Sequence, residues 1–208
     1  MATRIKICGI TRQEDADAVM QAGADALGLN FVAASPRRVD LARARAISTQ
    51  VAGTLTRVGV FVDPTPDEVT RVLDTVELDA LQFHGAESGD ECRRFGVPFI
   101  KALRVRGPLA IDELGLEYRG ACCLLLDAYV DGVPGGTGRS FDWSLWPGGS
   151  ELPLMLAGGL TPENVGEAVR RLDPWGVDVS GGVEGARRGE KDADRIRRFV
   201  EEVNRAGS

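Results

Sequence analysis

Two residues in this sequence have side chains that could exchange protons with a substrate. Cys8 closes the short run RIKIC, and Asp127 closes CCLLLD. A thiol becomes a base when positive charge or N–H donors lower its pKa from about 8.5, and a carboxyl group becomes an acid when desolvation raises its pKa. Together the two groups suit proton removal on one side of a substrate and proton delivery on the other.

Both residues also have an ordinary structural interpretation. Most free cysteines are small buried hydrophobes, although Gly9 follows Cys8 at a predicted strand end, which argues against burial in the strand wall. Asp127 could cap a helix or pair with a cation, while the apolar run at 124–126 favours its desolvation. On the residues alone, these alternatives stay open.

Two glycine pairs indicate an anion-binding site. Gly158 and Gly159 lie in LAGGLTPENV, and Gly181 and Gly182 follow Ser180 in VSGGVEGA. Glycine lets backbone N–H groups approach an anion closely, and a helix N-terminus favours negative charge. One such pair could be a tight turn only, but two pairs after consecutive predicted strands favour phosphate binding.

Three further residues are candidates for substrate binding. His84 is the only histidine of the chain, and a hydrogen-bonded structural role competes with a role in the site. Arg37, in SPRRV, could hold a carboxylate with its planar guanidinium group, although a surface charge is the commoner fate of an arginine. Asp178 alternates with Ser180 along the last predicted strand, so both side chains would face the mouth of the sheet.

The composition limits the classes of function. The chain has 208 residues, of which 43% are hydrophobic and 27% charged, as in ordinary globular proteins. A net charge of −6 argues against a general nucleic-acid binder and leaves an anionic substrate to be attracted by local groups. No signal peptide and no apolar run near the roughly 20 residues of a membrane span is seen, so we expect no membrane association.

The cysteines and the single histidine bear on metals and on the compartment. None of the four cysteines forms a CxxC pair, and one histidine in the whole chain argues against a zinc site. Reduced thiols fit a cytoplasmic location. The adjacent Cys122 and Cys123 should point to opposite faces of one strand and serve in packing.

The apolar pattern predicts alternating strands and helices. Eight short aliphatic runs predict strands at 4–8, 26–31, 57–62, 80–83, 99–102, 122–127, 154–157 and 176–180. Amphipathic segments predict helices at 12–22, 41–51, 66–76, 87–95, 162–172 and 192–203. The helical pattern of 106–118 is weaker and that of 141–146 is short, so the fifth and sixth helices are the least defined.

Local signals mark the helix ends. Thr11, three residues before Glu14, predicts the start of the first helix, and Pro162 predicts a proline at the first position of another. Three glycines predict helix ends, namely Gly23, Gly53 and Gly96.

Eight strand–helix units of this kind fit one closed barrel. Strands that alternate with helices pair in parallel through right-handed crossovers, and 208 residues suffice for a single-domain (β/α)8 TIM barrel over residues 1–208. An open doubly wound sheet is the alternative, but the chain has no early GxGxxG and no obvious switch point. In the barrel, loops seven and eight usually hold a phosphate, and they would lie between Cys8 and Asp127.

The sequence resembles the phosphoribosylanthranilate isomerase family, the Amadori-rearrangement enzymes of tryptophan biosynthesis, over essentially its whole length. KICGIT at 6–11, LQFHG at 81–85 and GGTGRSFDW at 135–143 are together highly specific. The other matching segments, in order, are GADALGLNF (23–31), SPRRV (35–39), VGVFVD (58–63), IKA (100–102), LLLDA (124–128), LAGGLTPENV (156–165), VDVSGGVE (177–184) and GEKD (189–192).

The resemblance implies a substrate and roles for the residues above. It implies conversion of N-(5-phosphoribosyl)anthranilate to 1-(2-carboxyphenylamino)-1-deoxyribulose 5-phosphate, with Cys8 as general base, Asp127 as general acid and Arg37 near the anthranilate carboxylate. The implied phosphate loops fall on Gly158, Gly159, Ser180, Gly181 and Gly182. It implies no metal and no organic cofactor, a small phosphorylated substrate as partner, and a monomer or a homodimer.

Two other functions remain as alternatives. Another phosphate-binding barrel enzyme, such as a sugar-phosphate epimerase or an indole-glycerol-phosphate synthase, needs an acidic, metal-ligating or lysine-centred site, which Cys8 and Asp127 do not supply. A non-catalytic sensor of a phosphorylated ligand has no need for either residue.

Overall fold

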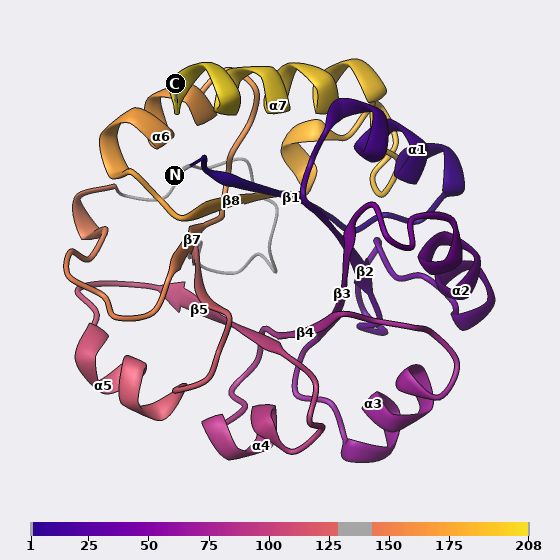
Figure 1. Ribbon diagram of the computed structural model, residues 1–208, viewed down its shortest axis with the longest axis horizontal. Coiled ribbons are helices and arrows are strands. Elements are labelled where there is room, and N and C mark those ends of the chain that lie inside the picture. The colour runs from indigo at the N-terminus through magenta and orange to yellow at the C-terminus, as the bar shows by residue number, and fades with distance from the viewer. Residues whose placement is uncertain (1, 129–142, 208) are drawn as a thin grey trace.

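The structure, a computed structural model, describes residues 2–128 and 143–207, which form a closed barrel of eight parallel strands. The strands follow one another around the barrel in chain order, and β8 pairs with β1 to close it. Helices surround the strands, which confirms the predicted (β/α)8 barrel (Figure 1). The strands are β1 (Arg4–Cys8), β2 (Ala26–Asn30), β3 (Thr56–Phe61), β4 (Ala80–Phe83), β5 (Phe99–Val105), β6 (Cys123–Ala128), β7 (Leu154–Leu156) and β8 (Gly176–Val179).

The outer layer contains the predicted helices, most with different ends, except that the described residues of the short one predicted at 141–146 form only a 3₁₀ helix. The α-helices are α1 (Gln13–Ala22), α2 (Leu41–Gln50), α3 (Pro66–Leu73), α4 (Gly89–Arg93), α5 (Ile111–Glu117), α6 (Val165–Leu172) and α7 (Ala193–Ala206). Two short 3₁₀ helices are η1 (Trp143–Leu145) and η2 (Gly181–Val183). The GGTG motif at 135–138 lies outside the described residues. None of the helices in the described part of the chain is long and apolar enough to cross a membrane.

Alternation along the strands separates two buried layers. Ile5 and Ile7 of β1 pack outward among the helices, whereas Lys6 and Cys8 take the alternate, inward positions. The barrel interior is filled by Val58, Ala80, Ile100, Ala102, Cys123, Leu125, Met155 and Ala157. Because side chains fill this interior, a substrate can bind only at a mouth of the barrel.

The longest described helix, α7, lies outside β1 and packs on α1 and α6 (Figure 1). Ile196, Phe199, Val200 and Val203 recur at helical spacing and are each at most 2% exposed. This apolar stripe brings the segment before α7 over β1 and β8, where it contributes to the site described below.

The predicted capping role of Thr11 is wrong. The helix α1 begins at Gln13, and its N-cap residue Arg12 makes no capping hydrogen bond from its side chain. The Thr11 hydroxyl instead donates to the carbonyl oxygen of Gly189 at 2.7 Å. The Thr11 hydroxyl, which the local pattern predicted to cap the helix, therefore makes a long-range hydrogen bond instead.

The predicted first-turn position of Pro162 is also wrong, because α6 begins later, at Val165. Asn164 precedes the helix, and its Oδ1 accepts a hydrogen bond from the Thr161 backbone N–H at 2.8 Å. Its Nδ2 donates to the carbonyl oxygen of Gly159 at 2.9 Å. The turn at 161–164 thus fixes the glycine loop after β7 instead of starting the helix.

The predicted glycine ends agree with the backbone. Gly23 ends α1 with a φ of 78°, in the left-handed region where glycine is favoured. Gly53 and Gly96 have φ values of 75° and 63° in the turns after α2 and α4.

Candidate active site

The carboxyl ends of the strands bring most of the predicted site residues to one mouth of the barrel. Cys8 ends β1, Asp127 lies one residue before the end of β6, and Asp178 is near the end of β8. His84 and Ser180 directly follow β4 and β8. Since parallel strands all end at the same rim, these five side chains gather there.

The Cys8 thiol occupies a small space between two glycines. The residue is 8% exposed, and a Cβ on Gly28, its partner on β2, would lie 2.7 Å from Sγ. Gly9 has a φ of 75°, and a Cβ there would lie 2.7 Å from Cδ of Arg37. Glycine at both positions lets the thiol and the Arg37 side chain come close to the backbone.

A buried ion pair lies one layer below Cys8. Lys6 is 1% exposed, and its Nζ donates to Oδ1 of Asp178 at 2.8 Å. Burial favours a lower pKa for Lys6, but the charges of Asp178 and Cys8 outweigh burial and raise its pKa. Burial raises the pKa of the Cys8 thiol; Lys6 and Lys191 oppose this rise, and Asp178 adds to it.

None of the other three cysteines ends a strand at the mouth: Cys92 lies in α4, Cys122 just before β6 and Cys123 at its start. All four are free, and only Cys122 is exposed. Burial raises the pKa of Cys92 to about 11 and that of Cys123 to about 12, so neither forms a thiolate near neutral pH. Packing by Cys123 is confirmed, whereas the packing role predicted for Cys122 is wrong, because its face of the chain is exposed just before β6 begins. Within residues 2–128 and 143–207, no group of three or more His, Cys, Asp or Glu could hold a metal ion.

The loops after β7 and β8 place the two predicted glycine pairs against each other. Gly158 and Gly159 have φ values of 87° and 67°, which side-chain-bearing residues rarely adopt. After β8, a Cβ on Gly182 would collide with the carbonyl oxygen of Leu160. The turn that contains Gly181 and Gly182 forms the short 3₁₀ helix η2.

Arg37 is buried, not a surface charge. Its Nε and Nη2 donate to the two carboxylate oxygens of Glu184 at 2.6 and 2.9 Å. Lys191 Nζ donates to the same carboxylate at 3.2 Å and to the Ser180 carbonyl oxygen at 3.1 Å. Burial alone raises the pKa of Glu184, but Arg37 and Lys191 outweigh it and the pKa is lowered. Burial is also the main reason that the pKa of Lys191 is lowered.

His84 lies beside the candidate acid. Its Nε2 is 3.3 Å from Oδ2 of Asp127, and the two side chains are 20% and 15% exposed. The contact has an ion-pair distance, but within the described residues His84 Nε2 has no hydrogen-bond partner of acceptable geometry. His84 therefore belongs to the group of side chains at the mouth, next to Asp127 and across the barrel from Cys8.

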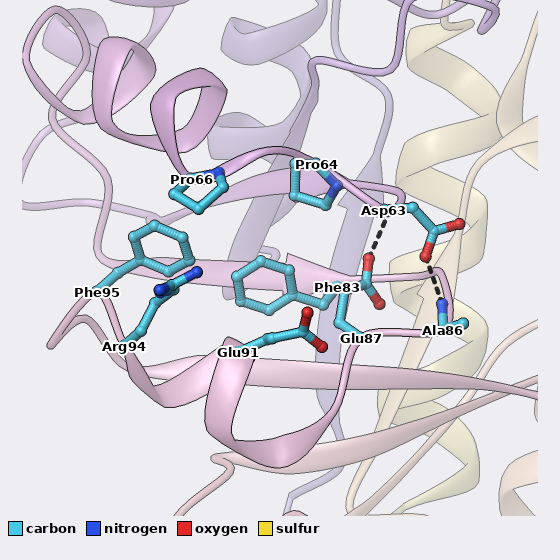
Figure 2. Close-up of a pocket in the computed structure, with 9 residues that line it drawn as sticks. All are labelled: Asp63, Pro64, Pro66, Phe83, Ala86, Glu87, Glu91, Arg94 and Phe95. Atoms are coloured by element: carbon cyan, nitrogen blue, oxygen red, sulfur yellow. Dashed lines mark hydrogen bonds between the residues drawn. The ribbon is translucent and has the colours of Figure 1, made fainter.

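The loop after β4 is held by a second buried pair, outside the barrel wall. Lys101 Nζ donates to Glu87 at 2.7 Å and to the Gly85 carbonyl oxygen at 2.8 Å. Glu87 accepts from the Asp63 backbone N–H at 2.7 Å, and Asp63 accepts from the Ala86 N–H at 2.6 Å (Figure 2). These bonds fix the backbone that follows His84.

A cavity of about 170 Å³ lies beside this loop, between α3 and α4 (Figure 2). None of the site residues predicted from the sequence lines it. Its lining consists of Asp63, Pro64, Pro66, Phe83, Ala86, Glu87, Glu91, Arg94 and Phe95. The cavity is therefore separate from the mouth that contains Cys8 and Asp127.

Three charged residues of the site, Lys6, Glu184 and Lys191, were not singled out from the sequence. Lys6 stands two residues before Cys8, so strand alternation alone could have placed both on the inner face. Glu184 and Lys191 follow β8 without a local pattern, and the pairing of Glu184 with Arg37 spans 147 residues of sequence. Only the folded chain brings those two to the mouth.

Known proteins with similar sequences identify the family. The profile of the family described as N-(5'phosphoribosyl)anthranilate (PRA) isomerase matches residues 5–202. The N-(5'-phosphoribosyl)anthranilate isomerase of Pseudomonas aeruginosa (strain LESB58) is 55% identical over 202 residues, which are 97% of this chain and 95% of that protein. The chain belongs to the N-(5'-phosphoribosyl)anthranilate isomerase family. As a member of this family it is an isomerase enzyme.

Solved structures of phosphoribosylanthranilate isomerases share the barrel. The enzyme of Thermotoga maritima matches with a TM-score of 0.86 and 40% identity, covering 97% of this chain and 98% of that chain. A phosphoribosyl anthranilate isomerase in complex with reduced 1-(o-carboxyphenylamino)-1-deoxyribulose 5-phosphate matches with a TM-score of 0.80 and 38% identity, with the same coverage. The resemblance seen in the motifs is thus confirmed for sequence and fold.

Proposed function

We propose that the chain converts N-(5-phosphoribosyl)anthranilate to 1-(2-carboxyphenylamino)-1-deoxyribulose 5-phosphate in tryptophan biosynthesis. The observation that carries this proposal is the order of groups around the mouth. Cys8 on β1 and Asp127 on β6 flank β7 and β8, whose following loops contain the two glycine pairs. A phosphate at those loops leaves the rest of a small substrate between the thiol and the carboxyl group.

Asp127 acts as the general acid that opens the ribose ring. It gives its proton to the ring oxygen while the bond from that oxygen to C1 breaks. The lone pair of the anthranilate nitrogen forms a double bond to C1, which leaves a protonated Schiff base. His84 lies 3.3 Å from the Asp127 carboxylate and helps to place it beside the ring.

Cys8 acts as the general base in the second step. Its thiolate takes the proton from C2, and the electrons of that C–H bond move toward the positively charged nitrogen to give an enolamine. Tautomerisation of the enolamine gives the aminoketone product. The nitrogen of the substrate accepts the electrons, so the step needs no metal and no organic cofactor.

The glycine loops bind the phosphate through backbone N–H groups. The left-handed glycines Gly158 and Gly159 and the start of η2 at Gly181 turn the backbone of both loops at the mouth. Ser180 adds a hydroxyl beside Gly181, although its Oγ donates to the Cys8 carbonyl oxygen at 3.0 Å. The arrangement suits an anion because glycine lets backbone N–H groups approach it closely and none of these residues carries a carboxylate.

Replacing Gly182 by alanine is expected to raise KM about tenfold or more, with a smaller change in kcat. The new methyl group would overlap the Leu160 carbonyl oxygen, so η2 would have to move. Its backbone N–H groups would then no longer point at the phosphate, which should weaken phosphate binding by about 1–2 kcal/mol. Steady-state kinetics measure this effect. Gly185→Ala is the control, because the nearest atom to a Cβ there is 3.9 Å away. Equal KM values for the two variants would contradict a phosphate role for η2.

Arg37 and Asp178 bind the two other parts of the substrate. The bonds of Arg37 to Glu184 use Nε and Nη2, which leaves Nη1 for the anthranilate carboxylate. Asp178 uses Oδ1 for Lys6, which leaves Oδ2 for a ribose hydroxyl. Both residues are held by buried partners before the substrate arrives, so little ordering is needed on binding.

Replacing Glu184 by glutamine is expected to raise KM severalfold and to lower the free energy of unfolding by about 2 kcal/mol. The change leaves Arg37 and Lys191 without their shared anion in a buried place. Kinetics and chemical denaturation measure the two effects. The control is Glu201→Gln, which removes an exposed partner of Arg197 and should cost less than about 0.5 kcal/mol. If both variants kept the KM and stability of the unchanged protein, Arg37 would not depend on Glu184.

Mixing the purified chain with N-(5-phosphoribosyl)anthranilate tests the proposed reaction directly. The anthranilate-type fluorescence should fall as the aminoketone forms, and the product should have an unchanged mass. No change with pure substrate would favour a different phosphate-binding barrel enzyme or a non-catalytic sensor.

We place the reaction in the cytoplasm, because all four cysteines are free thiols. The chain would act there as a monomer or a homodimer.

A further inference from the structure

Lys6 is a buried charge just below the mouth, and the steps above give it no role except to hold Asp178. It is 1% exposed, and it lies below the position proposed for the substrate. Placing an ammonium group in a barrel interior is costly unless the fold uses its charge. Its partner Asp178 removes part of the cost with a bond of 2.8 Å.

The positions of Lys6 and Cys8 are set by the same strand. Both occupy inward positions of β1, two residues apart, and both face Gly28 on β2. A Cβ on Gly28 would lie 2.7 Å from Sγ of Cys8 and 3.2 Å from Nζ of Lys6. The thiol and the ammonium group therefore share one small space that a side chain on β2 would otherwise fill.

We propose that Lys6 is a positioning residue for Cys8, and that its ammonium group, held in place by Asp178, stabilises the thiolate form of Cys8. The inference rests on the proposed role of Cys8 as the base. A thiol in an apolar interior keeps its proton, whereas a nearby cation favours the thiolate. Asp178 has two opposite effects on Cys8: it orients Lys6, and its own negative charge disfavours the thiolate.

The charged groups that face Cys8 come from three elements. Lys6 comes from β1, Asp178 from β8, and Lys191 from the segment before α7. Burial raises the pKa of the thiol, Lys6 is the strongest influence against that rise, Asp178 adds to it, and Lys191 opposes it. Lys191, which is bound by Glu184 and Ser180, has the weaker influence of the two lysines, so Lys6 is the cation best placed to act on the sulfur.

Titration of the Cys8 thiol in the unliganded protein tests this inference. The probe is iodoacetamide, whose reaction with Cys8 is followed across pH and separated from the other cysteines by peptide mass spectrometry. In Lys6→Met the pKa of Cys8 should rise by about one pH unit, so that Cys8 reacts about tenfold more slowly near neutral pH. In Asp178→Asn the pKa should fall, because Lys6 remains and the opposing anion is gone.

A matched control separates this effect from the general cost of removing a buried lysine. Lys101 is also 1% exposed and also pairs with a carboxylate at 2.7 Å, but it lies outside the barrel wall. Lys101→Met should leave the Cys8 titration unchanged. If Lys6→Met does not fold, Lys6→Gln, which removes the charge but keeps a polar side chain beside Asp178, decides the question by the same rise in the Cys8 pKa.

The outcomes are distinct from those of the activity assay. An unchanged Cys8 pKa in Lys6→Met would overturn the inference even if the chain isomerises its substrate. Opposite movements of the pKa in the two variants would support it even if turnover failed. In an active Lys6→Met protein, the acidic limb of the kcat/KM profile should also move to higher pH.

Discussion

Replacing Cys8 by alanine is expected to lower kcat about a thousandfold or more, while the protein stays folded. The methyl group of alanine fits the space beside Gly28, where the thiol now lies, but it cannot accept the C2 proton of the substrate. A positioned general base contributes about 10²–10⁴ to the rate, and no other described side chain occupies the place of Cys8 at the end of β1. Single-turnover fluorescence of N-(5-phosphoribosyl)anthranilate measures the loss.

The same experiment has a matched control and a clear contrary result. Cys122→Ala removes the exposed cysteine before β6 and should leave kcat unchanged. Binding of the reduced product analogue to Cys8→Ala should stay within about tenfold of the unchanged protein, because the phosphate loops are untouched. A Cys8→Ala protein with near-normal kcat would show that the base is a different group.

Replacing Asp127 by asparagine is expected to cause a loss of similar size. The amide has the shape of the carboxyl group and can stay near His84, but it cannot deliver a proton to the ring oxygen. Ring opening should then become rate-limiting, so kcat should fall about 10²–10⁴-fold, with a smaller change in KM. Stopped-flow fluorescence and a thermal denaturation curve measure activity and folding on the same sample.

Two companion variants sharpen the result for Asp127. Asp63→Asn, in the loop after β3, should keep most of the activity, because Asp63 bonds to the Ala86 backbone and lines the separate cavity between α3 and α4. His84→Gln should lower kcat less than Asp127→Asn does, since we assign His84 a placing role only. Turnover in Asp127→Asn within about fivefold of the unchanged protein would exclude Asp127 as the acid.

The sequence predicted the barrel for reasons that are local and repeated. Every strand run is short, apolar and closed by a turn, and each intervening segment has helical spacing, so eight units could be recognised even where single boundaries were uncertain. The helix starts were less predictable. Thr11 and Asn164 carry side chains that could cap a helix, but the folded chain uses Thr11 to bind the distant Gly189 and Asn164 to bind the nearby glycine loop at Gly159.

Some residues of the candidate site could likewise be predicted from the sequence, and others could not. Cys8, Asp127 and the glycine pairs could be found because each follows an apolar run, and the strand ends of a parallel barrel share one rim. Arg37 could be proposed, but its burial could not, because that depends on Glu184 at the opposite end of the chain. Lys191 likewise reaches the mouth only because α7 packs across α1 and α6.

Apolar spacing and turn residues therefore determined the number and order of the strands, and with them the rim on which the thiol and the carboxyl group lie. The tertiary structure decided the electrostatics of that rim. Burial raises the pKa of Cys8, and the fold sets against it Lys6, which strand alternation places below the thiol and which Asp178 from the last strand holds in place. The physical reason is that apolar periodicity depends on residues close together in the sequence, whereas electrostatic interactions depend on residues close together in space.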